Sequence, residues 1–125
     1  MKKILVAEDD IVICKLYQLH FKRNGYHGSF FTTGAGLIES AKLERPDLVL
    51  LDFELPDVNG PEVMRTLHEI PGCEKLPVIF VTGRATPEVV DNLREEGAVE
   101  VFGKPFSPLH LIHLIDRITS ESSPA

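Results

Sequence analysis

Short apolar runs alternate along the chain with longer segments in which apolar residues recur at helical spacing. The runs expected as strands are residues 4–7, 27–31, 48–51, 77–81 and 99–102, of which 27–31 is the weakest. The segments between them carry apolar residues three or four positions apart, as in helices that pack by one face. The pattern therefore predicts five strands that alternate with five helices.

Residues at the expected boundaries support this division. The helices are expected over 11–23, 36–44, 61–70, from Thr86-Pro87-Glu88 up to Gly97, and from Ser107-Pro108 onward. Thr33 and Asn59 are candidate N-caps, because their side chains can accept a hydrogen bond from a free backbone N–H group. Asn24-Gly25 and Pro71 are typical helix stops.

The alternation of strands and helices predicts one α/β domain with a parallel sheet and helices on both faces. The run 48–51 is apolar throughout, as expected of a central strand covered on both sides. The chain has 125 residues, enough for a single core. We expect the domain to span 1–120 and residues 121–125 to form a disordered tail.

Charge and hydropathy exclude several classes of function. The formal net charge is −6, which argues against direct binding to nucleic acid, because phosphate contacts need clustered Lys and Arg. Apolar runs are too short to cross a bilayer, so no membrane partner is expected. We also find no signal-peptide pattern and expect a cytoplasmic protein.

Acidic residues follow the first and third predicted strands. The stretch "ILVAEDD" ends in Glu8, Asp9 and Asp10, and Asp52 follows the apolar run 48–51. Carboxylates at about 5 Å repel one another by about 3 kcal/mol per pair at an effective dielectric near 20. Because the carboxyl ends of parallel strands form the usual ligand site of such sheets, these acids are expected to converge. Carboxylate oxygens suit Mg²⁺, and that cation would remove the repulsion.

Residues after the fourth and fifth strands complete a chemically consistent set. Thr82 and Lys104 can hold phosphoryl oxygens through a hydroxyl and an ammonium group. A carboxylate can act as a nucleophile and form an aspartyl phosphate. Phosphoryl transfer depends mainly on positioning and charge neutralisation, which a metal and a lysine opposite three acids would provide.

Four segments together resemble the signatures of response-regulator receiver domains, in the same order. They are "ILVAEDD", "DLVLLDFELPDVNG", "PVIFVTG" and "GKPF", and the resemblance covers nearly the whole chain. It implies a flavodoxin-like, doubly wound sheet with strand order 2-1-3-4-5 and five helices. It also implies a two-component phosphorelay receiver, a switch without dedicated small-molecule turnover.

The resemblance implies a role for each site residue. Asp52 would accept a phosphoryl group from a sensor histidine kinase, a phosphotransfer protein or a small phosphodonor. Mg²⁺ would be held by Glu8, Asp9, Asp52 and the backbone carbonyl of Glu54. Thr82 would bond a phosphoryl oxygen and move when the site is loaded, and Lys104 would pair with the phosphoryl group. The Lys104–Pro105 peptide bond is expected to be cis.

Some positions depart from the usual pattern of the family. Val101 stands where an aromatic switch residue is common, so we expect output to depend on backbone movement after Thr82, with Phe102 packed on the other side of its strand. Glu8 replaces a commoner aspartate. Glu54 and Arg84 occupy the positions that tune hydrolysis, and we expect them to form an ion pair that lengthens the phosphorylated lifetime.

Several alternatives remain open from the residues alone. Asp9 or Asp10 can cap the first helix, and for Asp10 this is the better interpretation. The chain could also be a phosphorylation-independent interaction module, or a Mg²⁺-dependent phosphatase with Asp52 as the nucleophile. The output partner is expected on the surface formed by the fourth helix, fifth strand and fifth helix. A homodimer through the last helix and strand is also compatible with the sequence.

Overall fold

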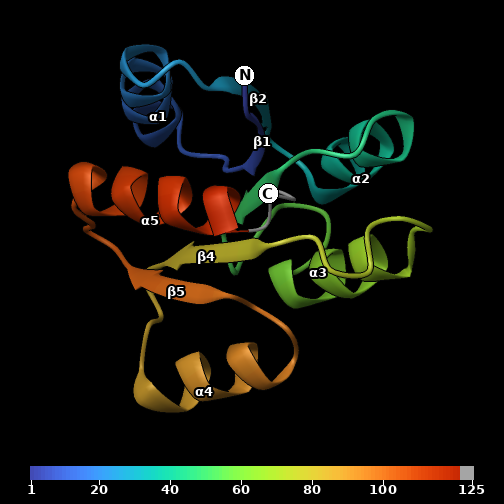
Figure 1. Cartoon of the computed structure of the whole chain (residues 1–125). Helices are drawn as coiled ribbons and strands as arrows, with labels where there is room; N and C mark the ends of the chain where they lie inside the picture. Colours follow the sequence, from blue (N-terminus) through green and yellow to red (C-terminus); the bar gives the residue numbers. More distant parts are fainter. Residues whose placement is uncertain (122–125) are drawn as a thin grey trace.

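The computed structural model describes residues 1–121, and within them five parallel strands form one sheet. The strand order is β2-β1-β3-β4-β5, as the resemblance implies (Figure 1). The strands are β1 (Lys3–Ala7), β2 (His27–Phe31), β3 (Leu48–Leu51), β4 (Val78–Thr82) and β5 (Glu100–Gly103). The reversal of strand order places β1 and β3 side by side at the centre, where two acidic strand ends meet.

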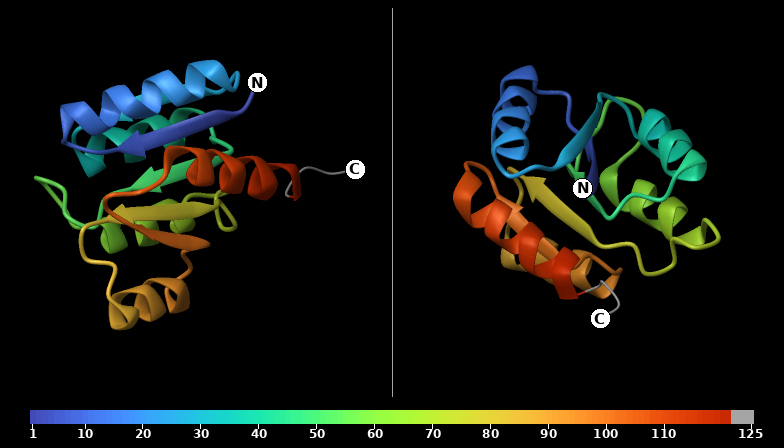
Figure 2. Two further views of the ribbon diagram at one scale, coloured as in Figure 1. Left: turned by 90° about the vertical axis from the view of Figure 1, so that its left-hand side faces the viewer. Right: turned by 45° about the horizontal axis from the view of Figure 1, so that its top comes forward.

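Helices cover both faces of the sheet (Figure 2). They are α1 (Ile11–Arg23), α2 (Gly34–Leu43), α3 (Gly60–Glu69), α4 (Pro87–Glu95) and α5 (Pro108–Glu121). Helices α1 and α5 pack on one face, and α2, α3 and α4 pack on the other. The predicted fold class is therefore confirmed.

The core consists of two apolar clusters separated by the sheet. Alternate residues of each central strand point to opposite faces, so that Leu50 joins the α1–α5 cluster while Val49 and Leu51 join the other. All four residues of β3 are buried, which agrees with its continuous apolar sequence. Strand β3 contributes buried side chains to both clusters, and Asp52 follows it directly.

Local hydrogen bonds begin the helices where capping residues occur in the sequence. Side-chain oxygens of Asp10, Thr33, Asn59 and Thr86 accept hydrogen bonds from backbone N–H groups in the first turns of α1 to α4. The caps expected at Thr33 and Asn59 are confirmed, and so is the capping role of Asp10. Helix α4 ends before Gly97, whose φ of 120° suits glycine.

Element boundaries differ from the prediction by one or two residues. Helix α2 begins at Gly34 rather than residue 36, because Asp57 from a distant loop satisfies the N–H groups of Gly34 and Ala35. Strand β4 runs from Val78 to Thr82, one residue later than expected. Thr82 is therefore the last residue of a strand rather than the first after it.

The end of the chain is described only in part. Helix α5 includes Glu121, so the helix enters the segment expected as a tail, and residues 122–125 lie outside the described residues. Among the residues described, no helix combines the length and apolar character needed to cross a membrane.

Candidate functional site

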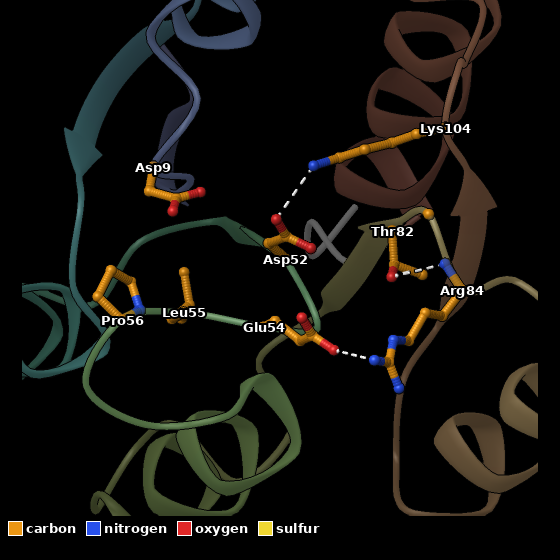
Figure 3. A pocket seen from close by; sticks show the side chains of 9 residues that line it. Asp9, Asp52, Glu54, Leu55, Pro56, Thr82, Arg84 and Lys104 are labelled. Carbon is orange, nitrogen blue, oxygen red and sulfur yellow. Dashed lines mark hydrogen bonds and ion pairs between the residues drawn. The ribbon is translucent and has the colours of Figure 1, made fainter.

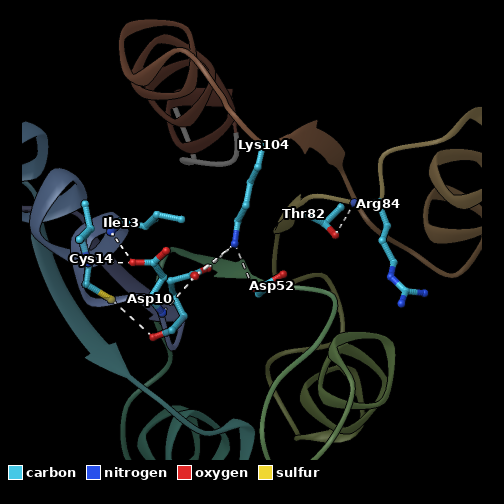
Figure 4. Close-up of polar contacts among 9 residues, drawn as sticks. Asp10, Ile13, Cys14, Asp52, Thr82, Arg84 and Lys104 are labelled. Carbon is cyan, nitrogen blue, oxygen red and sulfur yellow. Dashed lines mark hydrogen bonds and ion pairs between the residues drawn. The ribbon is translucent and has the colours of Figure 1, made fainter.

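Four strand ends bring the predicted site residues together at the carboxyl edge of the sheet. Glu8 follows β1, Asp52 follows β3, Thr82 ends β4 and Lys104 follows β5. Figure 4 shows Lys104 extending from its loop to Asp52, between the α1 side and the β4 side of the site. The parallel strand pairing β1–β3–β4–β5 produces this convergence, because it aligns their carboxyl ends.

Lys104 joins the two strand-end acids directly. Its Nζ donates to Asp52 Oδ2 at 3.0 Å and to both carboxylate oxygens of Glu8 at 3.1 Å. Its backbone N–H donates to the carbonyl oxygen of Thr82 at 2.8 Å, which fixes the start of the side chain beside β4. The Lys104–Pro105 bond is cis, as expected. One cation thus holds two carboxylates that would otherwise repel each other.

Burial and charge raise the pKa values of both Glu8 and Lys104, for different physical reasons. Burial, reinforced by the nearby charge of Asp52, raises the pKa of Glu8 even though Lys104 opposes the shift. Burial by itself would lower the pKa of Lys104, but hydrogen bonds to Asp52 and Glu8 outweigh it and raise that pKa. Lys104 therefore stays protonated across the physiological range, while Glu8 holds its proton more tightly than a free glutamate.

An acidic cluster lies beside the lysine. Glu8, Asp9 and Asp52 each offer a carboxylate oxygen, and these oxygens lie within 4.8 Å of one another. Glu8 is buried, whereas Asp9 is exposed, so that the cluster opens toward solvent on one side. Asp10 faces the other way: its Oδ1 accepts hydrogen bonds from Val12 and Ile13 at the start of α1. The donor set of three hard oxygens fits a divalent cation such as Mg²⁺.

An open cavity of about 660 Å³ adjoins the acidic cluster. Its lining residues come from the ends of β1, β3, β4 and β5: Asp9, Asp52, Glu54, Leu55, Pro56, Thr82, Gly83, Arg84 and Lys104. In Figure 3 the second oxygen of Asp52 points away from Lys104. Leu55 and Pro56 were not singled out from the sequence, because an apolar pair in a loop carries no chemical signal of its own.

Glu54 and Arg84 form the ion pair expected from their positions. Arg84 Nη2 lies 2.6 Å from Glu54 Oε1, and both side chains are largely exposed. The pair spans one side of the cavity (Figure 3). Thr82, only 2% exposed, accepts a hydrogen bond from the backbone N–H of Arg84 through Oγ1 at 3.1 Å. The effect of the pair on hydrolysis stays a prediction.

Val101 and Phe102 lie on opposite faces of β5. Val101 packs against the cluster beneath α2, α3 and α4, and Phe102 packs against the α1–α5 cluster. The ring of Phe102 meets His110 edge-on, with centroids 5.5 Å apart. The expectation that Phe102 faces away from Val101 is confirmed. The Val101 side chain is small and stiff at χ1.

Comparison with known sequences identifies close relatives of the chain. The model of the response regulator receiver domain matches residues 4–116. Protein Rrf1 of Nitratidesulfovibrio vulgaris is 36% identical over 115 residues, which cover 92% of this chain and 80% of Rrf1. The polar-differentiation response regulator DivK of Brucella anthropi is 31% identical over 114 residues, or 91% of this chain and 93% of DivK.

Solved structures share the fold. A CheY-like response regulator receiver domain protein from Methanospirillum hungatei superposes with a TM-score of 0.88 at 27% identity, covering 97% of this chain and 95% of that one. The receiver domain of the sensor histidine kinase PA1611 from Pseudomonas aeruginosa superposes with a TM-score of 0.86 at 24% identity, over 95% and 98% of the two chains. That structure contains a magnesium ion coordinated in its active-site cleft.

Proposed function

The chain belongs to the response-regulator receiver domains of two-component systems, and from this premise we propose that it is a phosphoacceptor switch with Asp52 as the acceptor. One observation carries the proposal. The Asp52 carboxylate lines an open cavity while Lys104 and two further acids surround it. This arrangement combines a nucleophile, a cation and a metal-binding donor set at one point.

The acidic cluster supports a magnesium site. Glu8, Asp9 and Asp52 would supply carboxylate oxygens, and the backbone carbonyl of Glu54 is the further ligand that the family resemblance implies. Bound Mg²⁺ would neutralise the charge of the cluster and of an incoming phosphoryl group. The burial of Glu8 and its raised pKa are consistent with a group that needs a cation beside it.

The phosphoryl-transfer step follows from the position of Asp52. One carboxylate oxygen attacks phosphorus, the bond from phosphorus to the donor breaks, and the donor atom keeps the bonding electron pair. The donor is the phosphohistidine of a sensor kinase or phosphotransfer protein, or a small acyl phosphate. The product is an acyl phosphate on Asp52, and the Lys104 ammonium, which lies 3.0 Å from Asp52 Oδ2, would neutralise its negative oxygens.

Hydrolysis would reset the switch at a rate set by access of water to phosphorus. Water attacks phosphorus, the carboxylate of Asp52 leaves, and inorganic phosphate is released. The Glu54–Arg84 pair lies beside Asp52 on the cavity wall, where it would restrict the approach of that water. The pair would therefore lengthen the phosphorylated lifetime.

Output would begin at Thr82. Its hydroxyl now accepts from the Arg84 N–H and would donate to a phosphoryl oxygen after transfer, which draws the end of β4 toward Asp52. With Val101 in place of an aromatic ring, the movement would reach the surface of α4, β5 and α5 through the backbone after Thr82. Crystal structures with and without the phosphoryl group test this: an immobile 83–86 segment would exclude it.

Incubation with acetyl phosphate and Mg²⁺, followed by intact-mass spectrometry, tests the function. We expect one phosphoryl adduct per chain, absent in Asp52→Asn. Asp10→Asn serves as a matched control, since Asp10 is a neighbouring acid that caps α1 and Asn caps equally well. Rapid turnover without a lasting adduct would favour a phosphatase, and no adduct would favour a phosphorylation-independent interaction module; either result contradicts the proposal.

A further inference from the structure

The side chain of Asp57 ties the loop that follows Asp52 to the start of α2 by two hydrogen bonds. Asp57 Oδ1 accepts from the backbone N–H of Gly34 at 2.9 Å, and Oδ2 accepts from Ala35 at 3.0 Å. We infer that Asp57 is a positioning residue for the metal-binding loop, residues 52–59, and that it preorganises the proposed magnesium site. The inference rests on the proposed function.

The hydrogen bonds at the start of α2 show that the contact is shared between two parts of the chain. Four backbone N–H groups at a helix start have no partner within the helix. In α2 the side chain of the local residue Thr33 serves only Gly36, through Oγ1 at 3.2 Å, and the N–H of Leu37 already makes the first helical bond, to the Thr33 carbonyl at 3.5 Å. Asp57 serves the first two from 23 and 22 positions away. The helix and the loop are thus mutually dependent.

The loop has a second attachment at its far end. The backbone N–H of Gly60 donates to the carbonyl of Phe53 at 2.7 Å, and a Cβ at Gly60 would lie 2.4 Å from the carbonyl oxygen of Asp52. This close approach fixes where the loop returns to the sheet. Between Phe53 and Gly60, the polar contact that Asp57 makes with α2 holds the outer part of the loop.

The part of the loop held between these two attachments carries site residues. Glu54, Leu55 and Pro56 line the cavity beside Asp52. The backbone carbonyl of Glu54, the proposed metal ligand, lies three residues before Asp57 in this segment. Loss of the Asp57 contact would let the segment move and would misplace that carbonyl. Supporting groups outside the ligand shell commonly change metal affinity by about 10- to 100-fold.

Packing shows that the loop and α2 meet closely as well. A Cβ at Gly34 would lie 2.6 Å from both Val58 Cγ1 and Val63 Cγ2, so the helix start presses on the loop and on α3. The two backbone hydrogen bonds also lower the pKa of Asp57, which keeps its side chain ionised where it accepts them. The loop and the start of α2 are therefore joined both by the Asp57 hydrogen bonds and by close packing of Val58.

Calorimetric titration with Mg²⁺ separates positioning from helix capping. Asp57→Ala removes the loop contact, and Thr33→Ala removes the local cap of the same helix without touching the loop. We expect both variants to melt at a lower temperature than the wild type. We expect Mg²⁺ affinity to fall about tenfold in Asp57→Ala and to stay within about twofold of wild type in Thr33→Ala. Asp57→Asn, which can accept from one N–H only, should fall between them.

Two results would be decisive against the inference. Equal Mg²⁺ affinity in the wild type and Asp57→Ala would overturn it, and so would an equal loss in Asp57→Ala and Thr33→Ala, since that would make Asp57 a helix cap alone. If the wild type binds no Mg²⁺, the proposed function itself fails and this inference fails with it. Measuring the wild type first therefore distinguishes the two failures.

Discussion

Replacement of Lys104 by methionine should destabilise the metal-free protein, because it leaves the acidic cluster without its cation. The Lys104 ammonium makes contacts of 3.0 Å with Asp52 and 3.1 Å with Glu8, and its side chain is 22% exposed. Methionine keeps most of the length and the apolar stem of the side chain. The perturbation is therefore mainly electrostatic.

The size of the effect follows from these distances. After the substitution the Glu8 and Asp52 oxygens still lie within 4.8 Å of each other. At an effective dielectric of about 20, their repulsion is about 3 kcal/mol. Removal of one member of a buried ion pair commonly costs about 3–5 kcal/mol. Because Lys104 is partly solvated, we expect the lower end, a loss of about 3 kcal/mol in the free energy of unfolding.

The loss should depend on pH with a definite sign. The folded state raises the pKa of Glu8 above 4.5, so its contribution to stability is present below about pH 4.5 and is lost as the pH rises through the folded pKa. Without Lys104, which lowers that pKa, the folded pKa rises further. The difference in the free energy of unfolding between wild type and Lys104→Met should therefore be largest near neutral pH and should decrease toward about pH 5. Lys104 itself stays charged over this window, since its pKa is raised from 10.5.

Urea unfolding in EDTA at about pH 7.5 and about pH 5 measures this difference in unfolding free energy. The same unfolding titration in saturating Mg²⁺ should give a smaller difference. Lys2→Met is the matched control, because Lys2 pairs with the exposed Asp116 at 3.2 Å. That surface pair should contribute about 1 kcal/mol or less, whatever the Mg²⁺ concentration. Two results would refute the electrostatic reasoning: a Lys104→Met variant as stable as the Lys2→Met control, or a difference in unfolding free energy that does not change with pH.

Three further substitutions test neighbouring parts of the site. Arg84→Ala breaks the ion pair with Glu54 and should shorten the phosphorylated lifetime by up to about fivefold, since an exposed pair is worth about 1 kcal/mol at most. The rate of acyl-phosphate decay measures this, and an unchanged rate would show that the pair does not restrict hydrolysis. Asp52→Asn removes one of the repelling charges and leaves Lys104 paired with Glu8, so it should stabilise the protein in EDTA by about 1 kcal/mol while abolishing stabilisation by Mg²⁺. A loss of stability in EDTA, measured by urea unfolding, contradicts this. Gly60→Ala should destabilise the protein by about 1–3 kcal/mol, because the added Cβ would lie 2.4 Å from the Asp52 carbonyl oxygen and 2.6 Å from Phe80, although alanine is otherwise the better helix residue. A melting temperature equal to that of the wild type would show that the loop moves to accommodate the methyl group.

Sequence patterns predicted the elements well where the interactions that form them are local. A cap such as Asn59 contacts an N–H group three residues away, and the apolar run of β3 requires burial wherever it packs. The convergence of Glu8, Asp52 and Lys104 was also predictable, since parallel strands align their carboxyl ends. The errors lie at boundaries such as the start of α2, where a residue from another loop changed the outcome.

The sequence by itself determined the order of the elements, their caps and the acids at the strand ends, because those depend on side-chain type and short spacing. Tertiary structure alone decided that Asp57 holds the start of α2, that Gly60 presses on the Asp52 backbone, and that Lys104 contacts Glu8 as well as Asp52. Each of these contacts joins groups that come close only after the sheet and its helices have packed, so that spacing along the chain carries no trace of them.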